Sequence, residues 1–136
     1  MTLLIADDSA LLRERIKNLA KATGKVKTVY EAENGVEAMQ IINNKKPNLV
    51  ILDIRMPLMN GIKVLERIKK EGIKTKVCIL TSYNFRQYRE KCTELGADYF
   101  FNKNDDIQQL VDLIKKLSKG KTDDNNHPHG KNRIES

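Results

Sequence analysis

The sequence predicts an α/β fold with an open, doubly wound parallel sheet of five strands, and three observations support this prediction. Short apolar segments alternate with amphipathic segments five times along residues 1–118 of the 136-residue chain. This alternation favours a parallel sheet with right-handed crossovers and helices on both faces. Residues 49–52 form an unbroken apolar run, typical of a strand buried on both faces. Five units are too few for a closed eight-stranded barrel, which needs about 200 residues or more. The strand order expected for such a sheet is 2-1-3-4-5.

The first two strand–helix units are marked by apolar runs and by capping residues. The apolar run 3–7 predicts the first strand, and Ser9 can cap the helix that follows. Apolar residues at helical spacing continue that helix until it stops near Gly24. A second strand is expected at about 26–32. Residues 34–37, Asn-Gly-Val-Glu, have capping-box spacing and open a helix that ends before the first proline of the chain.

The third and fourth units follow the same pattern. The third strand, 49–53, runs from four apolar residues into an aspartate, and a turn is expected at Asn60-Gly61. The next helix is expected to stop at Gly72. The run 76–81 predicts the fourth strand. Residues 84–87, Asn-Phe-Arg-Gln, again have capping-box spacing and are expected to start a helix that ends at a later glycine.

The fifth unit closes the domain. A strand is expected at 98–103, after which Asn104 can cap the last helix and two aspartates suit its positive end. Beyond residue 118 the composition becomes polar and turn-rich. We therefore expect one domain at 1–118 and a flexible polar tail at 119–136.

Composition limits the partners and the compartment. The chain has a formal net charge of +7, but its basic residues look scattered over solvated helix faces, so an acidic protein partner is favoured over nucleic acid. No apolar run is long enough for a membrane span. Cys78 and Cys92 lack metal-ligand spacing, which favours buried, reduced thiols in a cytoplasmic protein.

Polar residues stand at the carboxyl ends of the predicted strands. The first strand leads into Asp7 and Asp8, the third into Asp53, the fourth into Thr81 and the fifth into Lys103. Ligands bind at this edge of open α/β sheets. Neighbouring carboxylates repel each other, and Mg²⁺ with oxygen ligands would neutralise them. The ammonium and hydroxyl groups suit phosphoryl oxygens, which makes Asp53 a candidate nucleophile that would form an acyl phosphate.

These residues together resemble the receiver domain of two-component response regulators, over residues 2–118. By that resemblance the fold is the flavodoxin-like (βα)5 receiver fold, and the chain is similar to the single-domain, chemotaxis-regulator-like form. The motifs that carry the resemblance are Asp7-Asp8, Asp53, Met56-Pro57, Gly61, Thr81-Ser82, Gly96-Ala97-Asp98 and Lys103.

The resemblance implies a phosphorylation-activated switch in a phosphorelay. Asp53 would accept a phosphoryl group from a histidine kinase or a phosphotransfer protein. Mg²⁺ would be bound by Asp7, Asp8 and Asp53 and by the backbone carbonyl of Arg55. Such a protein is not an enzyme for external substrates, because it catalyses only its own phosphorylation and dephosphorylation.

The resemblance also implies how the signal leaves the site. Thr81 and Lys103 would bind the phosphoryl oxygens, and Thr81 would move towards them. Phe100 would swing inward to fill the vacated space, biasing a bistable packing arrangement. Alternation along the strand sends Phe100 and Phe101 to opposite faces, but it does not say which faces outward. The fourth helix, fifth strand and fifth helix would control a downstream protein. The protein would be a monomer or a weak phosphorylation-dependent dimer.

The sequence departs from the family pattern at three positions. Asn104 follows the lysine where the family often has a proline in a cis peptide, so a trans bond is expected. Arg55 and Tyr83 occupy the two variable positions that flank the phosphoryl group in the family. A bulky Tyr83 is expected to restrict the water that hydrolyses the acyl phosphate.

Three other functions remain as alternatives. The chain could be the receiver portion of a larger response regulator whose DNA-binding output domain is missing from it. A flavin-binding protein of this topology would need glycine- and hydroxyl-rich phosphate contacts after the first strand, where Asp7-Asp8 would instead repel phosphate. A hydrolase with an aspartyl-phosphate intermediate would usually place its nucleophile after the first strand and need a domain that covers the substrate.

Overall fold

The computed structural model describes residues 1–83 and 85–118. Five parallel strands form one sheet in the order β2-β1-β3-β4-β5, which confirms the predicted fold class. The strands are β1 (Thr2–Ala6), β2 (Thr28–Ala32), β3 (Leu49–Leu52), β4 (Lys76–Thr81) and β5 (Tyr99–Asn102). The helices are α1 (Ala10–Ala22), α2 (Gly35–Lys45), α3 (Gly61–Lys70), α4 (Arg86–Glu94) and α5 (Ile107–Leu117). The predicted tail lies outside the described residues.

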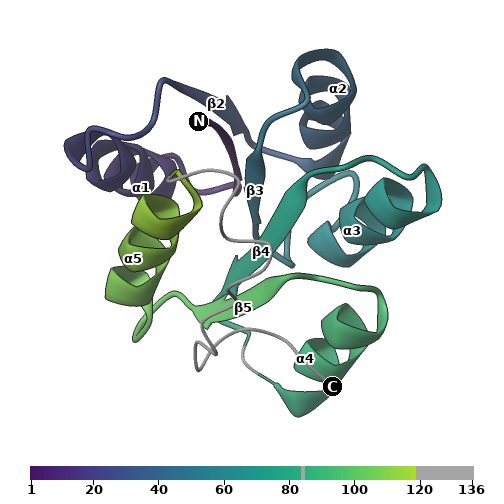
Figure 1. Cartoon of the computed structure of the whole chain (residues 1–136). Helices are drawn as coiled ribbons and strands as arrows, with labels where there is room; N and C mark the ends of the chain where they lie inside the picture. The colour runs from purple at the N-terminus through teal and green to yellow at the C-terminus, as the bar shows by residue number, and fades with distance from the viewer. Residues whose placement is uncertain (84, 119–136) are drawn as a thin grey trace.

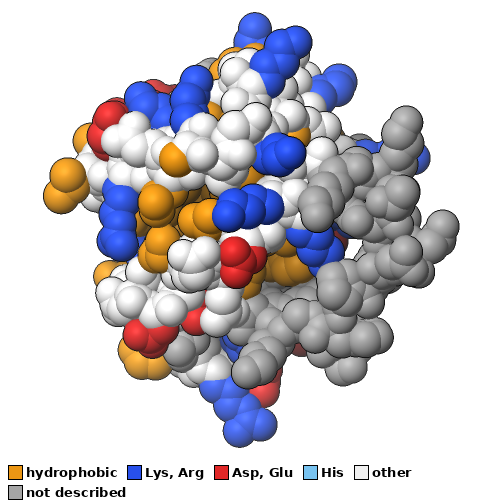
Figure 2. Space-filling view, turned by 60° about the vertical axis from the view of Figure 1, so that its left-hand side comes forward, with side chains coloured by type: hydrophobic (Ala, Val, Ile, Leu, Met, Phe, Trp, Pro, Cys, Tyr) orange, Lys and Arg blue, Asp and Glu red, His pale blue; other side chains and the backbone are white. Residues whose placement is uncertain are grey.

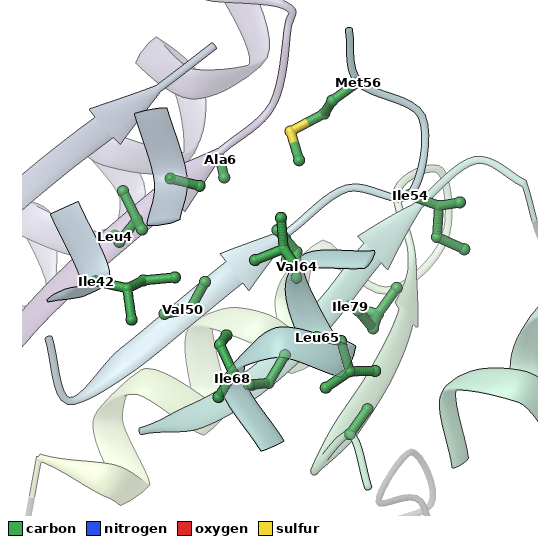
Figure 3. Packing of buried hydrophobic residues seen from close by; sticks show 14 of the residues in the cluster. Leu4, Ala6, Ile42, Val50, Ile54, Met56, Val64, Leu65, Ile68 and Ile79 are labelled. Atoms are coloured by element: carbon green, nitrogen blue, oxygen red, sulfur yellow. The ribbon is translucent and has the colours of Figure 1, made fainter. Parts of the chain in front are cut away.

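Helices cover both faces of the sheet, with α1 and α5 on one face and α2, α3 and α4 on the other (Figure 1). The strands supply both cores because successive side chains point to opposite faces. In β1, Leu4 packs towards α2 and α3, whereas Leu3 packs towards α1 and α5. In the α2–α3 layer, Val50 and Ile79 of the sheet meet Ile68 of α3 (Figure 3).

Three helix starts follow the capping chemistry of the sequence. The Ser9 hydroxyl accepts a hydrogen bond from Leu12 N at 3.2 Å, as predicted. The Asn34 side chain accepts one from Glu37 N at 2.8 Å, and the Glu37 carboxylate accepts one from the N–H of residue 33. The expected turn at Asn60 is a third cap, because its side chain accepts a hydrogen bond from the backbone of α3. Each such cap stabilises a helix by about 1 kcal/mol.

The last two helices begin differently from the prediction. The prediction that Asn104 caps the last helix is wrong, because Asp106 holds the N-cap position of α5. Asn104 N donates to the Asn102 side chain at 2.7 Å instead, within the tight loop that follows β5. Asn84 lies outside the described residues. The N-cap position of α4 belongs to Phe85, whose side chain makes no capping bond.

Smaller differences concern strand ends and backbone geometry. β2 begins at Thr28 and not near Val26, and β5 is limited to Tyr99–Asn102. The described residues contain no cis peptide bond, which agrees with the trans bond expected before Asn104. Cys78 and Cys92 are both free and buried. Burial raises the pKa of the Cys92 thiol to about 11, which fits a structural role.

No helix in 1–83 or 85–118 combines the length and apolar character needed to cross a bilayer.

Candidate functional site

The site lies at the carboxyl-terminal edge of the sheet, where backbone hydrogen bonds continue one step past the strands. Asp53 N donates to Ala6 O at 3.0 Å, which holds the start of the β3–α3 loop beside the end of β1. Lys103 N donates to Thr81 O at the same distance, which ties the end of β5 to the end of β4. The loops that carry the predicted site residues are therefore fixed to the sheet.

Lys103 joins two of the predicted carboxylates. Its ammonium lies 2.7 Å from Asp7 Oδ2 and 2.9 Å from Asp53 Oδ2. Both aspartate side chains are 4% exposed, and the lysine side chain is 17% exposed. Two buried acids therefore share one cation, which leaves the group one negative charge in excess. Ions this deeply buried are tolerated only when they are paired and hydrogen-bonded.

The backbone satisfies the remaining oxygen of each carboxylate. Asp7 Oδ1 accepts a hydrogen bond from Ser9 N at 2.9 Å, and Asp53 Oδ1 accepts one from Ile54 N at 2.8 Å. Such bonds favour the ionised form of a carboxylate. Each of the two carboxylates is therefore held at both oxygens, by Lys103 at one and by the loop backbone at the other.

Burial and pairing act in opposite directions on the protonation of this cluster. Burial raises the pKa of Asp7, and the hydrogen bonds from Lys103 and Ser9 offset this rise only in part. Burial alone would lower the pKa of Lys103, but its hydrogen bonds to Asp7 and Asp53 outweigh burial and the pKa is raised. The lysine therefore keeps its charge at neutral pH, whereas Asp7 is the acid that burial penalises.

The three acids can supply ligands for a hard cation. Oxygen atoms of Asp7, Asp8 and Asp53 lie within 4.8 Å of one another, with Asp8 exposed and the other two buried. Neighbouring ligands of octahedral Mg²⁺ stand about 3 Å apart, so small side-chain movements would bring these oxygens onto one ion. The donor set fits Mg²⁺, because it is made only of oxygen and opens to solvent at Asp8. Arg55, whose carbonyl was the fourth predicted ligand, follows in the β3–α3 loop.

Gly61 shapes the loop that carries Asp53. A Cβ atom at this position would lie 1.9 Å from the backbone oxygen of Asp53, closer than any side chain can approach. Gly61 N also donates to Ile54 O at 2.8 Å. The sequence marks Gly61 as part of a turn, and the structure gives the steric reason for the glycine at that place.

Arg13 is a contributor that the sequence does not reveal. Its Nη1 donates to the backbone oxygen of Asp7 at 2.6 Å, and its Nε donates to Glu31 of β2 at 3.0 Å. The side chain is only 13% exposed, although the sequence places it among scattered surface cations. It braces the acidic loop against β2, and only the tertiary pairing of β1 with β2 brings these groups together.

An open groove of about 730 Å³ lies beside the acids, lined in part by Asp8, Arg55 and Tyr83. The Arg55 guanidinium stands 4.5 Å from the centre of the Tyr83 ring, within the range of a cation–π contact. The two variable flanking residues thus contact each other at the mouth of the site.

The two predicted switch residues are both buried. Thr81 is 0% exposed, and its hydroxyl accepts a hydrogen bond from Tyr83 N at 3.1 Å. Phe100 is 1% exposed and packs in the α2–α3–α4 layer, under the guanidinium of Arg89 at 5.2 Å. Phe101 lies in the opposite core. Neither phenylalanine faces outward, so Phe100 already occupies the inward position.

Comparison with known proteins gives consistent matches. Residues 3–115 match the family described as the response regulator receiver domain. Sporulation initiation phosphotransferase F of Bacillus subtilis is 33% identical over 114 residues, which are 84% of this chain and 90% of that protein. The uncharacterized transcriptional regulatory protein YvfU of the same organism is 34% identical over 119 residues, which are 88% of this chain but only 60% of that protein. The chain likewise spans 56% of the transcription regulator BvgA of Bordetella pertussis.

Solved structures agree with this assignment. A DNA-binding response regulator of the LuxR family from Staphylococcus aureus superposes with a TM-score of 0.80 at 37% identity, covering 86% of this chain and 98% of that one. The response regulator domain of CheB from Thermotoga maritima gives a TM-score of 0.79 at 25% identity, covering 89% and 98%. Sequence, strand order and structural likeness agree, and the chain belongs to the receiver domain family of two-component response regulators, which are signalling modules.

Proposed function

We propose that Asp53 accepts a phosphoryl group and that this modification is the signal the protein carries. The observation that supports this most directly is the contact of Asp53 with Lys103, 2.9 Å away, beside two further acids. A buried carboxylate at a ligand-binding edge, paired with a cation, is suited to reaction with an anionic donor.

The proposed phosphoryl transfer to Asp53 balances in atoms and in charge. A carboxylate oxygen of Asp53 attacks the phosphorus of a phosphohistidine on a kinase or phosphotransfer protein. The P–N bond breaks as the O–P bond forms, and the ring, protonated on its other nitrogen, leaves with the electron pair as neutral imidazole. The acyl phosphate carries more negative charge than the carboxylate it replaces, and the ammonium of Lys103 then pairs with a phosphoryl oxygen. Catalysis consists of positioning and charge neutralisation.

Mg²⁺ held by Asp7, Asp8 and Asp53, with the Arg55 carbonyl as a further ligand, would neutralise the incoming phosphoryl charge. The excess negative charge of two buried acids on one lysine supports a need for such a cation. Asp8, the exposed member, would be the side chain that first meets the ion.

The output follows from Thr81 and the surface beyond it. A phosphoryl group on Asp53 draws the Thr81 hydroxyl away from Tyr83 N, its present partner, and loosens the β4–α4 loop. Because Phe100 is already inward, phosphorylation would hold that position and need not create it. The changed α4–β5–α5 surface then binds a downstream protein. We expect Lys103→Ala to remain phosphorylatable but to lose this output.

A second candidate function depends on the length of the natural protein. The chain spans 60% and 56% of two relatives named as transcription regulators, which supports a receiver that is one part of a larger DNA-binding regulator. The reading frame that encodes the chain distinguishes this from a single-domain regulator. The phosphorylation chemistry proposed for Asp53 is the same in both.

The test is Mg²⁺-dependent labelling by a small phosphodonor. The full chain is incubated with phosphoramidate, with and without Mg²⁺, and its intact mass is measured. Wild type should gain one phosphoryl group only with Mg²⁺, and the group should be stable to acid and labile to base. Asp53→Asn should gain none, whereas the control Asp112→Asn, on the exposed side of α5, should behave as wild type. Equal labelling of Asp53→Asn would refute the proposal.

A further inference from the structure

Many of the basic residues in 1–83 and 85–118 lie at one edge of the sheet. In a parallel sheet the helices run opposite to the strands, so every helix ends, and every helix-to-strand loop lies, at the amino-terminal edge. Each of the five helices has a basic residue in its last turn. The loops before β2, β3 and β4 add Lys25, Lys27, Lys46 and Lys74, and Lys76 is the first residue of β4. This distribution differs from the scattered arrangement expected from the sequence.

Backbone hydrogen bonds join these loops into one continuous row. Lys27 N donates to Met1 O at 2.8 Å, Asn48 N donates to Thr2 O at 3.0 Å, and Lys76 N donates to Asn48 O at 3.1 Å. Adjacent strands lie about 4.8 Å apart, so the loops before β2, β3 and β4 and the chain's amino terminus stand side by side. The loop lysines therefore form a single basic strip, which we call the lysine edge.

Helix dipoles account for only part of the lysine edge. A cation in the last turn of a helix stabilises its negative end, which explains the helical residues. The loop lysines are outside the last turns, and their side chains form no ion pair within 1–83 and 85–118. The same three loops contain Glu71 as their one acidic residue, and Glu71 pairs with Arg67 at 3.1 Å. Concentrated like charges destabilise a compact state by repulsion, so a local structural role does not explain them.

The lysine edge is also hollowed. A shallow depression of about 540 Å³ is lined by Lys69, Lys74 and Lys76, together with Asn48 and Asp98. The acid is partly neutralised, because Asp98 Oδ2 lies 4.0 Å from Lys69 Nζ. Three lysines that line one recess suit a phosphate group, which a lysine binds as a point charge on a flexible stem.

The lack of exposed apolar side chains at the lysine edge limits the class of partner that can bind there. The large exposed hydrophobic residues of the described chain are Leu11, Val36, Leu58 and Phe85. All four begin helices or lie in strand-to-helix loops, at the opposite, acidic edge. A protein partner usually needs aromatic or apolar anchors, and peripheral membrane binding usually adds apolar insertion to charge. Binding to a nucleic-acid backbone needs only cations.

We propose that the lysine edge binds the sugar–phosphate backbone of nucleic acid without reading its bases. The strip offers lysines but no arginine fork or exposed aromatic side chain for base contacts. The acidic carboxyl-terminal edge repels the same polyanion, so the molecule binds through one edge and leaves the Asp53 site open. The view in Figure 2 agrees with a predominantly basic surface, since Lys and Arg side chains are more widespread on it than Asp and Glu. This proposal does not depend on phosphorylation of Asp53.

The test compares two variants with equal changes in charge. The edge variant carries Lys25→Gln, Lys27→Gln and Lys74→Gln, and the control carries Arg15→Gln, Lys63→Gln and Arg86→Gln on the helices. Both are made in the full 136-residue chain and checked by thermal unfolding. Binding to short mixed-sequence DNA and RNA duplexes is followed by fluorescence anisotropy from low to physiological salt. A polyglutamate peptide and anionic phospholipid vesicles are the competing probes.

We expect wild type to bind both duplexes with similar affinity and without sequence preference. The edge variant should bind about tenfold or more weakly at low salt, and its salt dependence should fall by up to about 0.9 in log–log slope for each lost phosphate contact. The control variant should change little. The proposal is overturned if wild type does not bind at low salt, or if both variants weaken equally. It is also overturned if polyglutamate or vesicles bind more tightly than the duplexes through the same lysines.

Discussion

Lys103 is the residue on which the buried charges depend, because among residues 1–83 and 85–118 it alone forms an ion pair with both Asp7 and Asp53. Replacing it by methionine keeps the side-chain volume but leaves two buried carboxylates without their cation. We expect Lys103→Met to lower the free energy of unfolding in Mg²⁺-free buffer by about 3 kcal/mol. Addition of Mg²⁺ should restore part of this loss. Urea unfolding with and without Mg²⁺ measures both effects.

The pH dependence of this variant follows from Asp7. Burial raises the pKa of Asp7 above its ordinary value, so the folded state takes up a proton there more readily than the unfolded chain. The loss in Lys103→Met should therefore shrink as the pH falls. Lys63→Met is the matched control, since the Lys63–Glu66 pair is exposed and should be worth less than about 1 kcal/mol. Equal losses in the two variants, or a loss independent of pH, would contradict the assigned role.

Tyr83 is the residue expected to set the lifetime of the acyl phosphate. The centre of its ring lies 4.5 Å from the Arg55 guanidinium at the mouth of the site, and we expect this pair to hinder the approach of water. Tyr83→Ala should hydrolyse several-fold faster after phosphorylation, and Arg55→Ala should show part of the same effect. The measurement is the decay of the phosphorylated mass after the donor is removed. The control is Phe85→Ala, which changes an exposed aromatic side chain outside the groove. An unchanged rate of acyl-phosphate hydrolysis in Tyr83→Ala would contradict this role of Tyr83.

At the scale of elements, the start of α3 is fixed by its contact with the end of β3. Gly61→Ala would place a methyl group against the Asp53 carbonyl, so α3 or the Asp53 loop must shift. We expect a loss of about 3 kcal/mol in stability and weaker phosphorylation. Gly24→Ala is the control, because its φ of 72° costs about 1–2 kcal/mol but nothing lies within 4 Å of the new atom. Wild-type labelling in Gly61→Ala would show that the contact does not position Asp53.

The elements also show what the sequence could and could not predict. Apolar runs and alternation were sufficient for the strands and their order, because a buried parallel strand such as Leu49–Leu52 has few other interpretations. The cap of α5 was missed, because Asn104 turns back to Asn102 within a loop that only tertiary structure defines. Arg13 was missed for the same reason, since its partners come from another strand and from a backbone oxygen. The approach of the site side chains to one edge followed from topology, but the sharing of Lys103 by Asp7 and Asp53 did not.

At the scale of the whole molecule, the site and the proposed output surface are joined through β4 and β5. Thr81 and Phe100 lie on these neighbouring strands, two residue pairs apart in register. An acyl-phosphate mimic such as beryllofluoride with Mg²⁺ should therefore alter hydrogen exchange in the β4–α4 loop, α4 and β5. Amides of α2, which lies on the far side of α3, should change little. Protection confined to the loops that hold the ligand would contradict a switch that reaches α4 and β5.

The two edges of the sheet differ in the charge of the residues that they carry. Acids and the phosphorylation chemistry proposed for Asp53 occupy the carboxyl-terminal edge, and the lysine edge lies at the other end of the strands. Composition gives only the net charge of +7. The separation appears once the topology assigns each loop to an edge, which is why the sequence alone suggested a scattered distribution.

The central claim is that Asp53 itself carries the phosphoryl group. Borohydride reduces an aspartyl phosphate to homoserine, which marks the modified residue permanently. Protein treated with phosphoramidate and Mg²⁺ is reduced, digested and sequenced by tandem mass spectrometry. We expect homoserine at position 53, dependent on Mg²⁺ and absent without the donor. Homoserine at another aspartate, or none despite a gain in mass, would contradict it.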